Sequence, residues 1–180
     1  MSTLETSIAE DLRYPIGRFT VVASTPELRL KWIADIADAE SGLMQAVTGL
    51  SDAQLDTAYR TGGWTIRQVV HHVADSHMNG FIRFCKAVTE DNPTITAYQQ
   101  DEWVKLPHTL APVDSSLTLL ALLIQRWVPA LRQLPESTWS RGFMHPETGQ
   151  QSVDSMVQLY AWHGRHHIAH ITNARRRLNW

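Results

Sequence analysis

The sequence lacks a second cysteine, a long apolar run and an excess of charge, and each absence excludes a class of protein. Because Cys85 is the only cysteine, no disulfide can form within the chain, and a reducing cytoplasm fits this composition. Cys85 lies close to Phe81, Phe84 and Val88, so we expect an apolar packing residue rather than a nucleophile. No apolar run approaches the ~18 residues that a membrane-spanning helix requires. These absences predict a cytoplasmic protein without a membrane span.

The charge balance gives no sign of a nucleic-acid partner. Lys and Arg number 16 against 18 Asp and Glu, a net charge of -2, whereas nucleic-acid-binding proteins present a basic patch. The only basic run, Arg175-Arg176-Arg177, ends a predicted helix, where cations suit the negative end of the helix dipole. The opening segment "MSTLETSIAEDLRYPIG" contains acidic residues and no apolar core, so we expect no signal peptide. With 180 residues, 43% of them hydrophobic, we expect one domain over residues 1–180.

Helix signals dominate the sequence. Thr25 can cap a first helix, and Pro26 suits its first position because proline lacks the N–H that would be unpaired there. Thr65-Ile66-Arg67-Gln68 has the pattern of a capping box, and Ser152 can cap the last helix. Pro129 is expected to bend the third helix or to end it early. The expected helices are Pro26–Val47, Ile66–Thr89, Asp114–Gln133 and Val153–Leu178.

The order of these elements predicts an all-α protein, a four-helix bundle with long connecting loops. Leu50–Leu55 follows the first helix and Leu134–Trp139 follows the third, and each leads through a glycine-containing loop to a histidine-rich helix. This repeated plan is that of two related helical hairpins. Strand signals are scarce, and "RFTVVAS" is expected to be an extended arm. The connection from Asp91 to Val113 is long for a bundle, and "RGFMHPETGQQ" is expected to be a second polar loop.

The last predicted helix carries four histidines within nine residues, "WHGRHHIAH". At about 100° per residue, with His163 at zero, its apolar residues fall between roughly 20° and 120°. His167 lies at about 40°, inside that stripe, whereas His170 at about -20° and His166 at about -60° are expected progressively closer to solvent. His163 and His167 thus form an inward pair with the i,i+4 spacing by which a helix offers two metal ligands. Two hydrogen-bonded core histidines would produce the same pattern.

The second predicted helix offers three further histidines in "GGWTIRQVVHHVADSHMN". Periodicity places His77 in the apolar face, His72 at its flank and His71 facing away. The residues alone therefore leave the choice between His72 and His77 open.

These segments resemble those of the DinB/YfiT-like family, specifically its YfiT-type metal-dependent hydrolases. The resemblance covers nearly the whole chain and is carried, in order, by "RYPIGRF", "GGWTIRQVVHHVADSHMN", "NPTITAYQQDEW", "HPETG" and "WHGRHHIAHI". It implies a four-helix bundle in which three histidines hold one divalent metal ion per chain, zinc or nickel. The ligands that it implies here are His72, His163 and His167, with His77 as the alternative to His72.

The resemblance implies an enzyme with a small-molecule substrate. Three neutral imidazoles leave an open coordination position, where a water molecule can reach a pKa of about 7 and act in hydrolysis. The alternative is a thiol S-transferase, because several DinB-like relatives use a low-molecular-weight thiol. A second alternative is a non-catalytic binding bundle stabilised by its metal, for which a fourth protein ligand such as His77 or His170 would be the sign.

Other groups for the chemistry come from polar segments near the histidines. Candidate general bases or orienting groups are Asp75, Asp101, His145 and Glu147. Asp75 follows His72 by three residues and can orient that ring through its second nitrogen. The seven tryptophans leave room for an aromatic homodimer interface.

Overall fold

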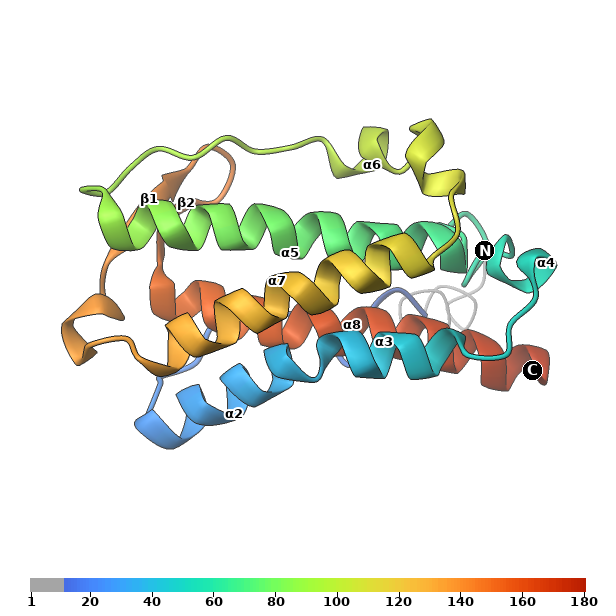
Figure 1. The fold of residues 1–180 in the computed structure, drawn as a ribbon, viewed down its shortest axis with the longest axis horizontal. Helices are drawn as coiled ribbons and strands as arrows, with labels where there is room; N and C mark the ends of the chain where they lie inside the picture. The colour runs from blue at the N-terminus through green and yellow to red at the C-terminus, as the bar shows by residue number, and fades with distance from the viewer. Residues whose placement is uncertain (1–11) are drawn as a thin grey trace, which may run out of the picture.

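The computed structural model describes residues 12–180, and they form a four-helix bundle (Figure 1). Its long helical segments are α2 (Pro26–Ala37) with α3 (Ala39–Val47), α5 (Ile66–Thr89), α7 (Asp114–Arg132) and α8 (Val153–Leu178). The predicted all-α fold is confirmed. Within residues 12–180 the only sheet is an antiparallel pair, β1 (Gly142–His145) and β2 (Gly149–Ser152). The expectation about a signal peptide falls largely on residues 1–11, which lie outside the described residues.

Side-chain caps fix where the two histidine-bearing helices begin. The Thr65 hydroxyl accepts from the Gln68 N–H while the Gln68 side chain accepts from the Thr65 N–H, which closes the predicted capping box. Ser152 and Ser155 form the same reciprocal pair at the start of α8. Both helices begin and end at the predicted residues. Thr25 caps α2, also as predicted.

One prediction about helix continuity is wrong, and one of the two outcomes expected at Pro129 does not occur. The first helix is not continuous, because Asp38, with ψ at -4°, separates α2 from α3. Aspartate is a poor residue for a helix interior. Conversely, Pro129 does not end α7 early, since the helix continues to Arg132. A proline so close to the end of a helix removes only one backbone hydrogen bond, and the buried side chains of Val128 and Leu131 hold the last turn against the core.

The segment expected to be a polar loop before α8 is the hairpin β1–β2. Phe143 is buried and anchors β1 on the core, while Gly149 starts β2 with φ at 75°, a backbone conformation that favours glycine. Met144 also exchanges backbone hydrogen bonds with Pro93 and Ile95 at 2.9 and 3.0 Å, so the hairpin holds the start of the 91–113 connection. The "RFTVVAS" segment is extended and unpaired as a strand, as expected, and the Gln158 side chain bonds both backbone groups of Val22.

The packing order of the helices explains the long connection. α8 packs against α2, α3 and α5, and α7 packs against α5, α2 and α3. In Figure 1, α5 and α7 run in the same direction, and α8 runs opposite to them. The chain must therefore return along the bundle between α5 and α7, and residues 91–113 do so with only α6 (Gln100–Trp103) and the 3-10 helix η1 (Pro107–Leu110) as regular structure.

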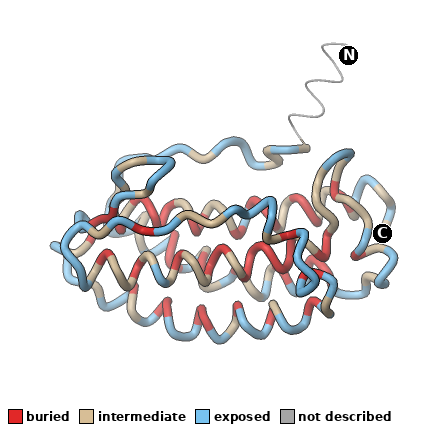
Figure 2. Tube along the Cα trace, turned by 90° about the horizontal axis from the view of Figure 1, so that it is seen from above, coloured by how far each residue is buried: buried red, intermediate tan, exposed pale blue. Residues whose placement is uncertain are grey.

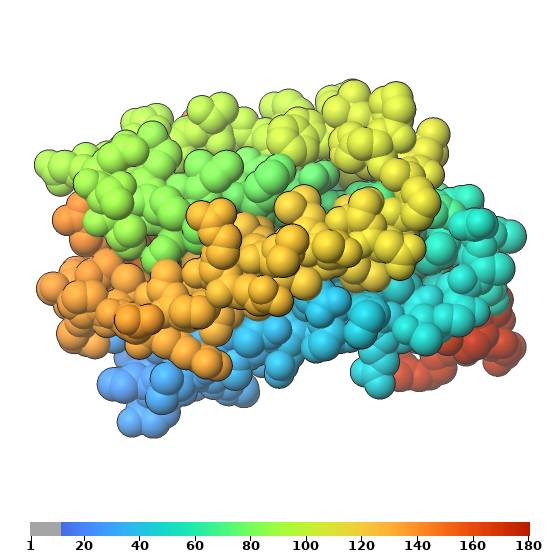
Figure 3. Space-filling view, viewed as in Figure 1, coloured from blue at the N-terminus to red at the C-terminus, as the bar shows by residue number. Residues whose placement is uncertain are grey.

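Short helices follow the first and third segments of the bundle, as the repeated sequence pattern suggested. These are α4 (Asp52–Leu55) and the 3-10 helix η2 (Glu136–Thr138). Buried positions lie along the inward faces of the long helices (Figure 2). Side chains of α7 fill the surface between α5 and the α2–α3 segment (Figure 3). No helix in the described part of the chain is both long enough and apolar enough to cross a membrane.

Candidate metal centre

Three imidazole rings from α5 and α8 converge inside the bundle. Nε2 of His72 lies 3.1 Å from Nε2 of His163. The ring centroid of His167 lies 4.8 Å from that of His72 and 4.4 Å from that of His163. One nitrogen from each ring lies within 4.8 Å of the other two. Because Zn–N bonds measure about 2.0–2.1 Å, two ligand nitrogens of a tetrahedral site stand ~3.3 Å apart, so this group could hold a metal ion.

Two glycines let the helices that carry these rings come close together. A Cβ at Gly80 of α5 would overlap the ring of Tyr160, which stands one turn before His163 on α8. A Cβ at Gly164 would lie 3.1 Å from the Cβ of Ala39 at the start of α3. The two glycines thus allow α5 and α3 to pack closely against α8 beside the histidines.

Trp64 covers the three-histidine group from the loop before α5. Its ring centroid is 4.6 Å from that of His72, and the ring stacks over His167 at 6.4 Å with an interplanar angle of 10°. Trp64 directly precedes the helix cap Thr65, so the capping box also positions this aromatic cover.

Burial keeps all three imidazoles neutral. Removal from water, with a smaller contribution from neighbouring histidines, lowers the pKa of His72 to about 3. Burial likewise holds the pKa of His163 and of His167 well below the usual range. Neutral rings present a lone pair, which is what a metal ligand requires.

A chain of hydrogen bonds sets which nitrogen of His167 carries its proton. Nε2 of His170 lies 3.1 Å from the backbone carbonyl of Arg13. A carbonyl can only accept, so this nitrogen donates, and the other nitrogen of neutral His170 is an acceptor. Nδ1 of His167 lies 3.4 Å from that acceptor and donates to it. The lone pair of His167 is therefore on Nε2 and is available to the three-histidine group.

Three expectations from periodicity are wrong. His166 and His170 are buried rather than close to solvent, and His71 does not face water. His166 stacks on Trp162 at 4.2 Å, and His170 stacks on Tyr59 at 4.1 Å. His71 bonds Ser116 at 2.7 Å and the carbonyl of Ala111 at 3.1 Å. The periodicity of one helix cannot anticipate the burial of His170 and His71, because Tyr59 and Ala111 come from distant connections and Ser116 comes from another helix.

His77 is buried as predicted but lies outside the three-histidine group. Its Nδ1 donates to the carbonyl of Val73 at 2.9 Å. Asp75 does not orient His72, whose Nδ1 has no hydrogen-bond partner among the described residues. The Asp75 carboxylate instead faces His108 at 3.5 Å. Burial raises the pKa of Asp75, and His108 opposes that shift.

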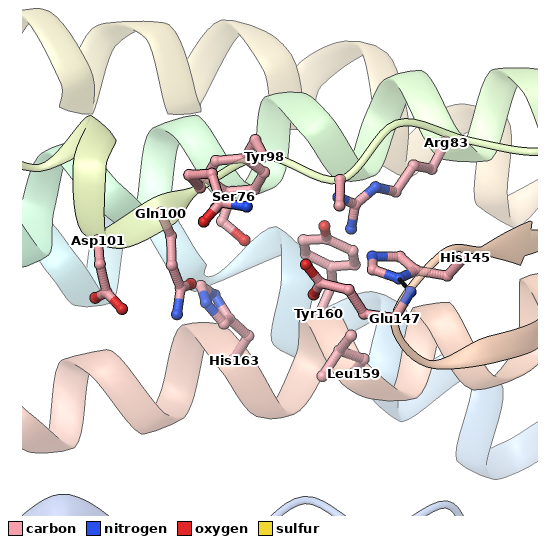
Figure 4. A pocket seen from close by; sticks show the side chains of 12 residues that line it. Ser76, Arg83, Tyr98, Gln100, Asp101, His145, Glu147, Leu159, Tyr160 and His163 are labelled. Carbon is pink, nitrogen blue, oxygen red and sulfur yellow. Dashed lines mark hydrogen bonds between the residues drawn. The ribbon is translucent and has the colours of Figure 1, made fainter.

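Two cavities open onto His163. The larger, about 400 Å³, extends along α5 and α8 past Tyr160 towards His145 and Glu147 (Figure 4). The second, about 350 Å³, contains the whole three-histidine group and is walled by aromatic rings that include Trp64 and Trp162. Asp101 of α6 lines both cavities. The 91–113 connection thus brings Asp101, one of the predicted polar groups, into the walls of both cavities.

Sequence reasoning missed several residues of the larger cavity, namely Ser76, Arg83, Tyr98 and Tyr160. Ser76 and Arg83 stand seven residues apart on α5, hence on one face of the helix. This spacing is the signal by which the sequence could have grouped Ser76 with Arg83. Tyr98 could not be placed in advance, because only the course of the 91–113 connection brings it to α5.

Comparisons with known proteins show the family and the fold to which the chain is similar. The family model of the DinB superfamily matches residues 36–171. A Bacillus mycoides protein named "Putative metal-dependent hydrolase" is 53% identical over 172 residues, which cover 95% of this chain and 99% of that protein. A Bacillus cereus protein of the same name is 53% identical over 94% of this chain and 99% of its own. The solved structure of YfiT from Bacillus subtilis, described as a probable metal-dependent hydrolase with an unusual four-helix bundle topology, matches with a TM-score of 0.92 and 44% identity, covering 94% of this chain and 99% of that one.

Proposed function

The chain belongs to the DinB superfamily, and from this premise we propose that it is a metal-dependent hydrolase whose single divalent ion, zinc or nickel, is held by His72, His163 and His167. The observation that carries the proposal is the convergence of three nitrogens from three neutral rings. The donor chain from His170 supports it, because it directs the lone pair of His167 to the same point. The names of the related proteins support the reaction class.

The number of ligands favours catalysis over a purely structural role. Structural zinc sites are closed by four protein ligands, whereas catalytic sites keep one position open. Three side chains form the group within residues 12–180, and neither His77 nor His170 joins it. When bound, a divalent ion supplies a Lewis acid at such an open position and brings the pKa of a water molecule there to about 7.

The side chains around the group supply positioning and proton transfer. Asp101 lines both cavities beside His163 and forms no ion pair with another described residue. Its carboxylate is placed to accept the proton of an attacking water molecule and to pass it to the leaving group. The ring of Trp64 packs against the rings of His72 and His167 and limits their contact with bulk water.

A second candidate, transfer of a low-molecular-weight thiol to an electrophile, is favoured by the two cavities that meet at His163. One cavity would hold the thiol and the other its acceptor. The thiol sulfur would form a carbon–sulfur bond, the acceptor's leaving group would depart with its electron pair, and Asp101 would take the thiol proton. Hydrolysis needs room for one organic substrate and water, so the number of organic molecules bound distinguishes the two candidates.

The test begins with metal content. Protein purified without a histidine tag is expected to bind about one zinc or nickel ion per chain, measured by mass spectrometry, and the His72→Ala/His163→Ala variant is expected to bind none while its helical circular dichroism persists. The loaded protein is then assayed with nitrophenyl esters and anilides, and with a small thiol plus an alkylating electrophile. Absence of metal uptake by the folded wild-type protein would overturn the proposal.

The same proposal places the protein in the cytoplasm, with a small molecule as its substrate. Cell fractionation tests the location. Sedimentation velocity tests the homodimer, which stays a prediction from the tryptophan content alone.

A further inference from the structure

Arg83 is a cation without a carboxylate partner in the wall of the larger cavity. It lies on α5 and is half-buried. No carboxylate of the described residues lies within ion-pair distance of its guanidinium, although Arg29 and Arg67 each have two such partners. Because Arg83 lines a cavity and no carboxylate of the described residues balances its charge, an anionic ligand in that cavity can supply the partner.

Neutral donors surround this cation. The Arg83 guanidinium and the Ser76 hydroxyl both lie beside the hydroxyl of Tyr160. Burial raises the pKa of Tyr160, and it raises the pKa of Tyr98, on the opposite wall, to about 12, so both phenols keep their protons and can donate. Figure 4 shows Arg83 reaching from α5 towards Tyr160 and His145.

We propose that Arg83 is the centre of a carboxylate-binding subsite in the larger cavity, with the Tyr160 and Ser76 hydroxyls as further donors. A guanidinium presents a planar fork of N–H groups that matches the two oxygens of a carboxylate. The charge balance favours a singly charged anion over a phosphate dianion. The subsite contains one cation, and the acidic Glu147 and Asp101 line the same cavity.

The subsite implies a substrate class for the proposed enzyme, and in this respect it rests on the proposed function. His163 and Arg83 line one cavity, and Tyr160, beside Arg83, stands one turn before His163 on α8. A substrate with its carboxylate on Arg83 would reach the three-histidine group with its other end. The geometry therefore selects acids whose reacting bond is separated from the carboxylate by a spacer that reaches from Arg83 to His163, and it disfavours the corresponding amides.

Binding to the metal-free protein tests the subsite independently of catalysis. The probes are butyrate, its uncharged isostere butyramide and inorganic phosphate, with binding of the organic probes followed by broadening of their proton NMR signals and phosphate added as a competitor. Butyrate is expected to bind the wild-type protein and butyramide is not, while phosphate is expected to displace butyrate poorly. Arg83→Gln is expected to weaken butyrate binding at least tenfold. Arg83→Lys is expected to retain part of the butyrate affinity, because lysine keeps the positive charge but lacks the planar pair of N–H donors.

Two variants serve as controls. Arg126 is exposed on α7 over the ring of Phe81 and lies outside the cavity, so Arg126→Gln removes one positive charge without changing the subsite. It is expected to leave butyrate binding unchanged. Glu147→Gln is expected to strengthen binding or leave it unchanged, whereas a loss would show that Glu147 rather than Arg83 organises the cavity. Equal binding of butyrate to the wild-type and Arg83→Gln proteins, with unchanged melting temperatures, would overturn the subsite and leave the metal proposal untouched.

Discussion

His72 and His163 are 91 positions apart in the sequence, yet their Nε2 atoms lie 3.1 Å from each other across the bundle. Both rings are neutral because burial lowers their pKa values. Nδ1 of each ring has no hydrogen-bond partner among the described residues. The nitrogens that converge are therefore the Nε2 atoms, and the ring of His167 completes a group that could hold a metal ion.

Removal of one ligand is expected to remove metal-dependent stability. A bound ligand stabilises the folded state by about 2.7 kcal/mol at a concentration one hundred times its Kd. Zinc or nickel is thus expected to raise the melting temperature of the wild-type protein, and a chelator is expected to reverse the rise. His167→Ala is expected to show neither effect. His145→Gln is the control, because His145 lines the larger cavity outside the three-histidine group; equal metal responses of His167→Ala and wild type would contradict the ligand assignment.

His170 is expected to act through His167 rather than on the metal directly. Residues that orient a metal-binding histidine typically change metal affinity by 10–100-fold when they are replaced. His170→Ala removes the acceptor for Nδ1 of His167, so a loss of this size is expected in competition titrations with a chromophoric chelator, with one ion still bound at saturation. His166 is a matched control, since it is buried on the same helix with its Nδ1 unpartnered. Equal losses for His170→Ala and His166→Ala would show a packing effect instead.

Asp35 is expected to destabilise the protein increasingly as the pH rises. Burial raises the pKa of its carboxyl, and Arg165, 3.5 Å away, only partly opposes this. An acid whose pKa is higher in the folded state holds its proton more tightly there, so its favourable contribution is present at low pH and is lost as the pH rises through the folded pKa. Asp35→Asn is expected to raise the free energy of unfolding at pH 7.

The pH dependence of the stability distinguishes the cost of ionising Asp35 from a change in stability that is the same at every pH. The stability curves of Asp35→Asn and the wild-type protein, from urea unfolding, are expected to converge as the pH falls towards 4. Asp91→Asn is the control, because Asp91 is exposed and forms no ion pair with another described residue. A destabilised Asp35→Asn protein at pH 7 would show that the pair with Arg165 outweighs the cost of burying the carboxylate.

Local signals predicted the helices well, because the information lies within a few residues of each boundary. The reciprocal caps at Thr65 and Ser152 set the starts of α5 and α8, and the i,i+4 spacing identified His163 and His167 as one group. The hairpin that begins at Gly142 depends on backbone bonds to Pro93 and Ile95 of a distant segment, and its own sequence does not contain that information. The poor helix propensity of Asp38 was an unused local signal for the break between α2 and α3.

The choice of His72 marks the limit of periodicity. A helical wheel ranks residues by their distance from the apolar face, and this ranking favoured His77, which is indeed fully buried. A group open to cavities needs side chains at the flank of that face, where burial comes from connections such as the loop that carries Trp64. The family resemblance supplied His72, and the structure places it with His163 and His167, whereas periodicity alone left the matter open.

Gly80→Ala is expected to destabilise the bundle although alanine is the better helix former. The substitution gains about 1 kcal/mol in helix propensity. The new methyl group, however, would overlap the buried ring of Tyr160, so the ring or the helices must shift. Overpacking of this kind costs typically 1–3 kcal/mol and occasionally more, so after the gain in propensity we expect a net loss of up to about 2 kcal/mol. Denaturant unfolding measures it.

Two further variants show whether the ring of Tyr160 is the cause. In Gly80→Ala/Tyr160→Leu, the smaller side chain is expected to recover part of the loss, so the double-mutant cycle should give a favourable coupling. Gly42→Ala is the matched control: its Cβ would meet only the terminal methyl of Ile168, at 2.8 Å, and that flexible group can turn aside. It is expected to be neutral or stabilising. If Gly80→Ala behaves in the same way, close approach of α5 to α8 is not what holds Tyr160 beside His163.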